Sequence, residues 1–171
     1  MDRRIDQPRY RQVVHSPLGG LAILANDDAI VAVKFGAQQH ADDRPNPLTR
    51  FGGQQLAEYF DGRRHVFDVP VAGPGTTFQR RVWRALCEIP FGTSCSYQQL
   101  ARAIGQPTAA RAVGSANGAN PIPIIVPCHR VIGSAGQLVG FGGGLQRKRW
   151  LLEHEGTLRP VQDEARCPAE R

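Results

Sequence analysis

Short apolar runs alternate with turn-forming residues through the first part of the chain. Apolar runs at residues 13–14, 21–25 and 30–35 are separated by stretches rich in Gly, Asn and Asp at 16–20 and 26–28. This spacing is typical of strands joined by tight turns, and it predicts a β-hairpin arrangement.

A helix and one more strand complete this part of the chain. Residues 48–60 have helical spacing of their apolar side chains, and residues 65–70 form a short β-type run. The Gly-Pro-Gly sequence at 73–75 is typical of a domain boundary. We therefore predict an α/β N-terminal module, a small sheet plus a helix, over residues 1–75. It contains no candidate chemistry.

After this boundary the apolar positions recur with helical spacing. The first predicted helix, capped by Thr76 or Thr77, carries four apolar side chains on one face: Phe78, Val82, Leu86 and Ile89. Two further helices are predicted at 97–104, capped by Ser96, and at 109–117. Two helices joined by a short glycine-containing turn have the spacing of a helix-turn-helix. The predicted organisation is a mostly α domain over residues 76–156 and a flexible tail over 157–171.

The helix predicted at 109–117 carries mainly small side chains. Apart from Arg111, Val113 and Asn117, its residues are Ala, Gly or Ser. Such a helix can bring its backbone close to another surface, with Arg111 as its one long projection. Tight packing inside the protein explains the composition equally well, and both interpretations stay open.

The chain is organised around an apolar run and the polar residues that follow it. Residues 122–126 predict a buried strand that ends at Pro127, which cannot donate to a ladder. Cys128, His129 and Arg130 come next, and a thiol with ionisable neighbours is a candidate nucleophile. A structural cysteine beside a satisfied histidine is the alternative. Adjacent side chains of a strand point to opposite faces, so His129 reaches Cys128 only if Pro127 starts a turn or a water bridges them.

The net charge of +6 is concentrated in one segment. Residues 1–75 hold nine basic and nine acidic residues, and residues 157–171 hold three of each. Residues 76–156 hold nine basic and three acidic residues. Such an asymmetry fits a polyanionic partner such as nucleic acid, and a solvated basic face is the alternative.

Other functional classes find little support in the sequence. The cysteines show neither CxxC spacing nor a disulfide framework, so reduced thiols and a cytoplasmic location are expected. No apolar run has the length of a membrane span. The glycines at 140–144 do not complete a GxGxxG motif, which argues against a nicotinamide or S-adenosylmethionine site. We expect no cofactor and no bound metal.

The last predicted helix, 145–155, carries its charges against the helix dipole. Arg147, Lys148 and Arg149 crowd its first turn, while Glu153 and Glu155 lie near its end. Each placement costs about 0.3–1 kcal/mol. The basic turn can instead face phosphates, and a terminal Glu can hold an imidazole. Exposed helices also tolerate such patterns.

These motifs resemble those of the O6-alkylguanine-DNA alkyltransferases over residues 73–156. The resemblance is carried by five short motifs: SYQQLA at 96–101, RAVG at 111–114, NPIP at 120–123, PCHRVI at 127–132 and WLLEHEG at 150–156. It implies direct-reversal DNA repair by stoichiometric, irreversible transfer of an alkyl group to Cys128. The group would come from O6 of a guanine flipped out of duplex DNA, with O4 of thymine open as a second target.

The resemblance implies roles for the matching residues. Cys128 is the alkyl acceptor, His129 acts on it as a base through a water, and Glu155 orients His129. Asn120 holds the turn that shapes the site, and Tyr97 lies by the 3′ phosphate of the target nucleotide. Arg111 fills the gap left in the base stack. DNA contacts are expected from Ser96, Tyr97, Ala110, Arg111, Ala112, Gly114 and Arg130. Backbone groups near Val131, Phe141 and Gly142 line the base pocket.

The resemblance also implies a fold and a partner. The N-terminal module is expected to be ribonuclease H-like, and residues 76–156 are expected to form a winged helix-turn-helix that binds double-stranded DNA through the minor groove. A monomer is expected, with cooperative assembly on DNA left open. Some family members have Tyr and Ser in place of Phe141 and Gly142, which leaves the pocket polarity open. Some carry a structural zinc, which we do not expect because residues 1–86 contain no cysteine.

Three other functions compete with this interpretation. A lesion sensor that flips the base without transfer would lack the acceptor, yet Cys128 is present. A Cys-His hydrolase would need an oxyanion hole and would have no use for Arg111. A zinc site built from Cys87, Cys95, Cys128 and His129 matches no zinc module.

Overall fold

The protein is described here by a computed structural model covering residues 7–158. The chain forms two compact units, one made of Met1–Pro74 and Pro121–Ile125 and the other of Gly75–Asn120 and Val126–Arg171. The coarse prediction of an N-terminal sheet module and a helical C-terminal domain is confirmed. Within the described part of the chain, no helix combines the length and apolar character that crossing a membrane requires.

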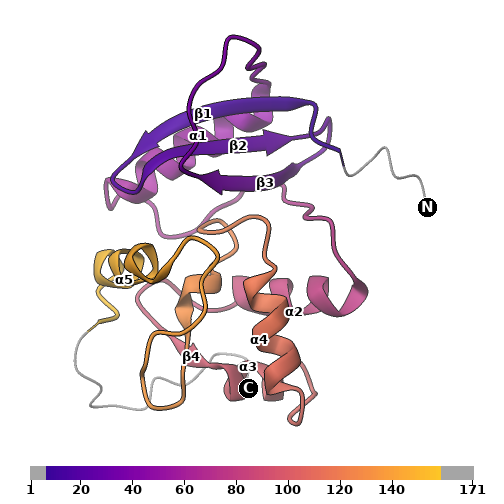
Figure 1. Ribbon diagram of the computed structural model, residues 1–171, viewed down its shortest axis with the longest axis vertical. Coiled ribbons are helices and arrows are strands. Elements are labelled where there is room, and N and C mark those ends of the chain that lie inside the picture. The colour runs from indigo at the N-terminus through magenta and orange to yellow at the C-terminus, as the bar shows by residue number, and fades with distance from the viewer. Residues whose placement is uncertain (1–6, 159–171) are drawn as a thin grey trace. The chain divides into compact units, whose positions relative to one another are not determined.

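The first unit contains a three-stranded antiparallel sheet in the order β1-β2-β3 (Figure 1). Its strands are β1 (Tyr10–Ser16), β2 (Gly19–Ala25) and β3 (Ile30–Phe35). The second turn is closed by Asn26, whose Oδ1 accepts hydrogen bonds from the backbone amides of Asp28 and Ala29. The predicted hairpin strands are therefore confirmed.

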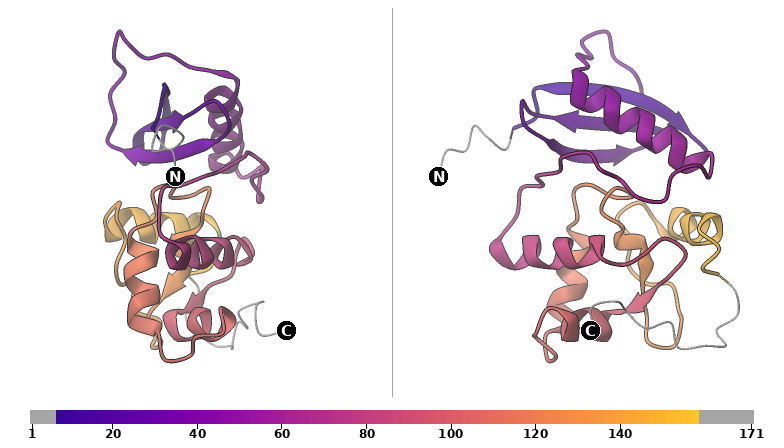
Figure 2. Two further views of the ribbon diagram at one scale, coloured as in Figure 1. Left: turned by 90° about the vertical axis from the view of Figure 1, so that its right-hand side faces the viewer. Right: turned by 180° about the vertical axis from the view of Figure 1, so that it is seen from behind.

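Helix α1 (Pro47–Phe60) lies across one face of this sheet (Figure 2). A capping box formed by Asn46 and Thr49 starts the helix, as such side chains satisfy its free amides. Gly52 permits close packing, because a Cβ atom there would lie 2.5 Å from Cδ1 of Ile30. The predicted helix is confirmed.

Two predicted strands are wrong. Residues 65–70 form no strand, and near them only an isolated parallel bridge joins Ile30 to Val71. The apolar run at 122–126 forms a buried turn, in which Ile124 has a φ of +76°. A β-branched residue rarely adopts this left-handed conformation, and Pro123 has no amide hydrogen for a ladder.

The second unit consists mainly of helices: α2 (Thr77–Cys87), α3 (Tyr97–Ala103), α4 (Ala110–Gly118) and α5 (Leu145–His154). Short strands β4 (Cys95–Ser96) and β5 (Val131–Ile132) pair in parallel, and η1 (Cys128–Arg130) is one turn of 3-10 helix. The side chains of Thr76 and Ser96 cap α2 and α3, as predicted.

Helix α4 has one buried and one exposed side, so each interpretation of its small residues holds for part of it. Val113, Ala116 and Asn117 are buried, and the indole nitrogen of Trp83 donates to the Ala116 carbonyl at 2.8 Å. Arg111 and its neighbours on the opposite side are exposed. Helices α2 and α3 both pack against α4.

Candidate active site

The candidate active site begins at a turn that follows Pro127. The backbone amide of Arg130 donates to the Pro127 carbonyl at 3.1 Å, which closes η1. Pro127 therefore starts a turn, one of the two arrangements that the sequence requires for His129 to serve Cys128. Cys128, His129 and Arg130 are all buried, with exposed fractions of 4%, 0% and 5%.

A buried carboxylate binds two of these three residues. Glu155 follows the last residue of α5, and its Oε1 lies 2.8 Å from Nε2 of His129. Arg130 donates to the same carboxylate from Nε at 2.8 Å and from Nη2 at 3.0 Å. The third nitrogen of its guanidinium donates to the carbonyl of Ile89. The predicted contact between a terminal Glu and an imidazole is thus present.

The ionisation of this cluster is set by burial and by its internal hydrogen bonds. Burial alone would raise the pKa of Glu155, but bonds and charges from His129 and Arg130 outweigh it and lower the pKa to about 2. Burial lowers the pKa of His129, and the nearby carboxylate only partly opposes this. The imidazole is therefore neutral, with Nε2–H donating to Glu155. Its Nδ1 is buried and makes no hydrogen bond with any described residue, so its lone pair is free to accept a proton.

The Cys128 thiol is protonated in this environment. Burial raises its pKa to about 11, although a hydrogen bond from Asn120 and the charge of Lys148 act in the opposite direction. Asn120 also donates from Nδ2 to the Val126 carbonyl at 2.8 Å, which ties the end of α4 to the chain entering η1. Forming a thiolate here requires a base close by, and His129 is the adjacent residue.

Lys148 is a site residue that the sequence analysis missed. Its side chain is fully buried, and Nζ donates to the carbonyls of Val131 at 2.6 Å, Val139 at 2.7 Å and Gly140 at 3.3 Å. Burial lowers its pKa to about 8, and the neighbouring Cys128 partly opposes that shift.

The three basic residues in the first turn of α5 (147–149) therefore do not all face solvent. The spacing in the sequence indicates this burial, because Lys148 lies three and four residues before Leu151 and Leu152, which are buried on the same face. Glu155 lies seven residues after Lys148 and shares that face.

The residues expected to contact DNA lie on α3, at its capping residue Ser96 and on α4, with one exception. Arg111 and Ala112 are exposed, and Ser96, Tyr97, Ala110 and Gly114 are half-buried. The Tyr97 hydroxyl donates to the Val139 carbonyl at 3.1 Å. Arg130 is the exception: its buried guanidinium is turned toward Glu155 and Ile89, so we do not retain it as a DNA contact.

The expected base pocket lies between β5 and the glycine-rich loop, residues 140–144. Val131 is buried and its carbonyl is held by Lys148, while Phe141 is half-buried and Gly142 is exposed. A Cβ atom on Gly142 would lie 3.8 Å from the Gly118 carbonyl, so this loop reaches the end of α4.

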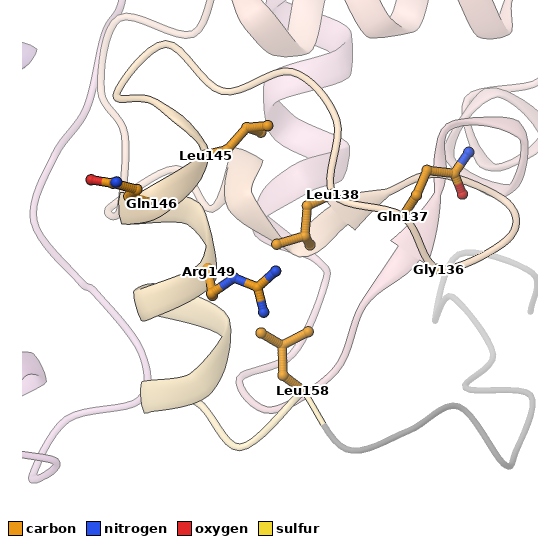
Figure 3. Close-up of a pocket in the computed structure, with 7 residues that line it drawn as sticks. All are labelled: Gly136, Gln137, Leu138, Leu145, Gln146, Arg149 and Leu158. Carbon is orange, nitrogen blue, oxygen red and sulfur yellow. The ribbon is translucent and has the colours of Figure 1, made fainter.

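A separate cavity of about 470 Å³ lies between residues 136–138 and α5 (Figure 3). Three leucines and a single cation border it, and the full lining is Gly136, Gln137, Leu138, Leu145, Gln146, Arg149 and Leu158. None of the predicted site residues lines this cavity, so its volume says nothing about the Cys128 chemistry.

The described residues offer no metal centre in place of this site. Across residues 7–158 no group of three or more His, Cys, Asp or Glu side chains is placed to hold a metal ion. None of the described cysteines forms a disulfide; Cys87 is exposed, and Cys95 and Cys128 are buried. The four residues of the competing zinc site are therefore not brought together as a ligand set in the described structure.

Comparisons with known proteins identify both units of the chain. Residues 77–157 match the 6-O-methylguanine DNA methyltransferase DNA binding domain, and residues 9–72 match the ribonuclease-like domain of the same methyltransferases. A methylated-DNA–protein-cysteine methyltransferase of Mycobacterium bovis is 46% identical over 157 residues, covering 89% of this chain and 95% of the relative. One of Salmonella typhimurium is 60% identical over 105 residues, covering 61% of each chain.

A solved structure is similar to most of the chain. The crystal structure of Mycobacterium tuberculosis OGT in complex with DNA matches with a TM-score of 0.78 and 45% identity. The match covers 89% of this chain and 96% of the other.

Proposed function

The chain belongs to the family of 6-O-methylguanine DNA methyltransferases, and on that basis we propose that it repairs alkylated guanine in duplex DNA by direct reversal. Its activity is that of a methylated-DNA–protein-cysteine methyltransferase. The observation that carries the residue assignment is the buried His129 beside Cys128, whose Nε2 is hydrogen-bonded to Glu155 and whose Nδ1 has no partner among the described residues.

The transfer step forms one bond and breaks one. Sγ of Cys128 attacks the alkyl carbon in line with the bond to O6, and the carbon–oxygen bond breaks as the carbon–sulfur bond forms. The electron pair left on O6 restores the carbonyl of guanine. N1 of the base takes up a proton from water, and His129 later returns to solvent the proton that it received from the thiol, so the proton count balances. The thiol loses its proton to Nδ1 of His129 through a water. The product is a neutral thioether and an unmodified guanine.

Glu155 and Arg130 support this proton transfer. With Nε2–H donated to Glu155, the tautomer of His129 leaves Nδ1 as the acceptor. Once the imidazole of His129 is protonated, the carboxylate of Glu155 lies beside it as a counter-ion. Arg130 holds that carboxylate from a second direction and keeps it ionised. Arg130 is thus a positioning residue for the base.

Access to O6 requires the target nucleotide to leave the base stack. A flipped base costs a few kcal/mol of unstacking, and a side chain that enters the gap offsets part of this cost. Arg111 on the exposed side of α4 suits this role, and the small residues Ala110, Ala112 and Gly114 suit close approach to a minor groove. Ser96 and Tyr97 at the start of α3 would contact the backbone of the target strand.

The finer features of the fold belong to the same proposal. We assign α3 and α4 to a helix-turn-helix, with the β4–β5 pair as its wing, and the first unit to a ribonuclease H-like module. We keep the domain limits expected from the sequence, 1–75 and 76–156, except that residues Pro121–Ile125 cluster with the first unit. The tail predicted at 157–171 lies outside the described residues from 159 onward.

The reaction is limited to one alkyl group per chain, because a thioether is a poor leaving group. Mixing the protein in increasing amounts with duplex DNA containing O6-methylguanine, then digesting the DNA to nucleosides, tests this. We expect guanine to replace O6-methylguanine in a one-to-one ratio with added protein. Repair of many lesions per chain would contradict a stoichiometric acceptor. Binding without repair would indicate a lesion sensor.

A further inference from the structure

The turn that follows α2 lies against the buried charge cluster. The backbone amide and the hydroxyl of Thr93 donate to the Pro90 carbonyl at 3.2 and 2.9 Å, and Gly92 has a φ of +76°. A Cβ atom at Gly92 would lie 3.2 Å from the carbonyl oxygen of Glu155. Glycine therefore lets this turn approach the backbone of the residue whose carboxylate binds His129.

Phe91, inside this turn, contacts the cation of the cluster. Cζ of Arg130 lies over its ring, 5.9 Å from the ring centroid, which is within the roughly 6 Å over which a cation–π attraction acts. The nitrogens of the same guanidinium are bonded to the Glu155 carboxylate and to the Ile89 carbonyl. The ring is thus a further contact of Arg130, beyond its hydrogen bonds.

This ring covers a cluster that is otherwise closed to water. The side chains of His129 and Glu155 have an exposed fraction of 0% and that of Arg130 has 6%, whereas Phe91 is half-buried. A half-buried ring in contact with a buried charge excludes water from that side of it. The cation–π attraction is also stronger where the charge is desolvated.

Two rings of α5 continue the cover from Phe91. His154 meets Phe91 edge to face, with the ring centroids 6.5 Å apart, and directly precedes Glu155 in the chain. Trp150 stacks on His154, with the centroids 4.9 Å apart. The turn after α2 and the end of α5 are therefore joined by ring contacts next to the carboxylate.

We propose that Phe91 is a positioning residue for alkyl transfer, which holds Arg130 and, through it, keeps the Glu155 carboxylate against His129. This inference rests on the proposed function. Without the ring, water reaches the guanidinium, and the attraction between Arg130 and Glu155 weakens as the local dielectric constant rises. The loss of one cation–π contact corresponds to roughly twofold to thirtyfold slower transfer.

The pH profile of transfer distinguishes positioning from packing. Burial holds the pKa of His129 below its ordinary value of 6.5, and the charges that act on it are those of Glu155 and Lys148 from α5 and of Arg130 from its own turn. Water near the cluster weakens the effect of burial. Loss of Phe91 should therefore raise the pKa of His129 toward 6.5, so that the base is protonated over a wider acid range.

The test is single-turnover transfer from duplex DNA containing O6-methylguanine, measured from about pH 5.5 to about pH 8. The F91A variant should be slower than the unchanged protein, and the slowing should be larger at the acid end. The F91Y variant keeps the ring and should restore both the rate and the profile. Phe51→Ala removes a ring that is 41% exposed on α1 of the first unit, and this matched control should change neither.

Other titratable side chains lie near this contact. His154 meets Phe91 from α5. On the side of α2, burial raises the pKa of Cys87, Glu88 adds to this, and the charge of Arg130 opposes it. His154→Phe keeps a ring beside Phe91 and removes one titration, and Cys87→Ala removes another. The F91A substitution should shift the pH profile equally in both backgrounds.

The outcomes separate this proposal from the proposed function. A slower F91A with the pH profile of the unchanged protein, or an F91Y that does not restore the rate, would make Phe91 a packing residue and overturn the proposal. So would a shift that disappears in either background variant. Urea unfolding of each variant confirms that rates are compared for folded protein.

An NMR titration of the His129 imidazole gives the same pKa comparison without DNA. We expect a higher pKa in F91A than in F91Y or in the unchanged protein, and equal values would overturn the role of Phe91. If the unchanged protein transfers no alkyl group, the proposed function is refuted, and this titration still decides whether Phe91 acts on the base.

Discussion

Replacing Glu155 by glutamine removes the charge at the centre of the buried cluster. The carboxylate is fully buried and binds His129 once and Arg130 twice, at 2.8 to 3.0 Å. After the change, the buried guanidinium of Arg130 has no counter-ion. The Nε2–H donor of His129 can also face the amide nitrogen of the new glutamine, which is itself a donor. Both effects destabilise the folded state.

The magnitude follows from the pKa of Glu155. Its fall from 4.5 to about 2 corresponds to about 3 kcal/mol of stability carried by the ionised form. This agrees with the roughly 3–5 kcal/mol lost when one partner of a buried ion pair is removed. For a chain of this length, the midpoint of thermal unfolding should fall by roughly 6–12 °C.

The pH dependence has a defined sign. Because the folded-state pKa lies below the unfolded one, the stabilisation is fully present above about pH 4.5. It is lost as the pH falls from 4.5 toward 2. The difference in stability between the unchanged protein and E155Q should therefore be constant near neutral pH and should shrink below pH 4.5.

The assay is urea unfolding followed by tryptophan fluorescence. Trp83 and Trp150 are the two tryptophans of the chain, and both lie in the second unit with Glu155. The matched control is Glu153→Gln, since that side chain is 55% exposed and only 4.0 Å from Arg149, a weak surface pair. A loss below 1 kcal/mol in E155Q, or a loss that does not depend on pH, would refute the reasoning.

Three further predictions concern the other charged groups of the site. Lys148→Met should lose roughly 1–3 kcal/mol in the same urea assay, because three buried carbonyls lose their donor, while Arg149→Met should be neutral; equal effects would contradict the assignment. Arg111→Ala should slow single-turnover transfer by a factor of about ten to a hundred in duplex DNA but much less in single-stranded DNA, and equal slowing in both would exclude a role in the stack. Alkylation of Cys128 by iodoacetamide, measured by peptide mapping, should rise about tenfold per pH unit from pH 7 to 10, because its raised pKa of about 11 keeps thiolate scarce, and a plateau below pH 9 would contradict this.

The regular elements could be predicted because local chemistry determines them. Alternating apolar residues and the Asx turn at Asn26 specify the hairpins, and side-chain caps at Thr76 and Ser96 mark where α2 and α3 begin. The contact of Glu155 with His129 could be anticipated from a charge placed against the helix dipole. These features depend on residues close together in sequence or on a visible energetic cost.

The remaining features depend on tertiary context. The run at 122–126 is as apolar as a strand, yet its backbone turns at Ile124, and burial alone cannot distinguish the two. Lys148 and Arg130 are basic residues whose buried partners lie well apart from them in the sequence, including the carbonyls of Val131 and Ile89. A count of charges assigns such residues to the surface.

The most direct test of the central claim is the intact mass of the protein after incubation with duplex DNA containing O6-methylguanine. Transfer predicts a gain of about 14 Da, limited to one addition per chain and located on Cys128 by peptide mapping. The Cys128→Ser variant, treated in the same way, should keep its original mass. An unchanged mass in the unaltered protein, or an addition at another residue, would contradict the account.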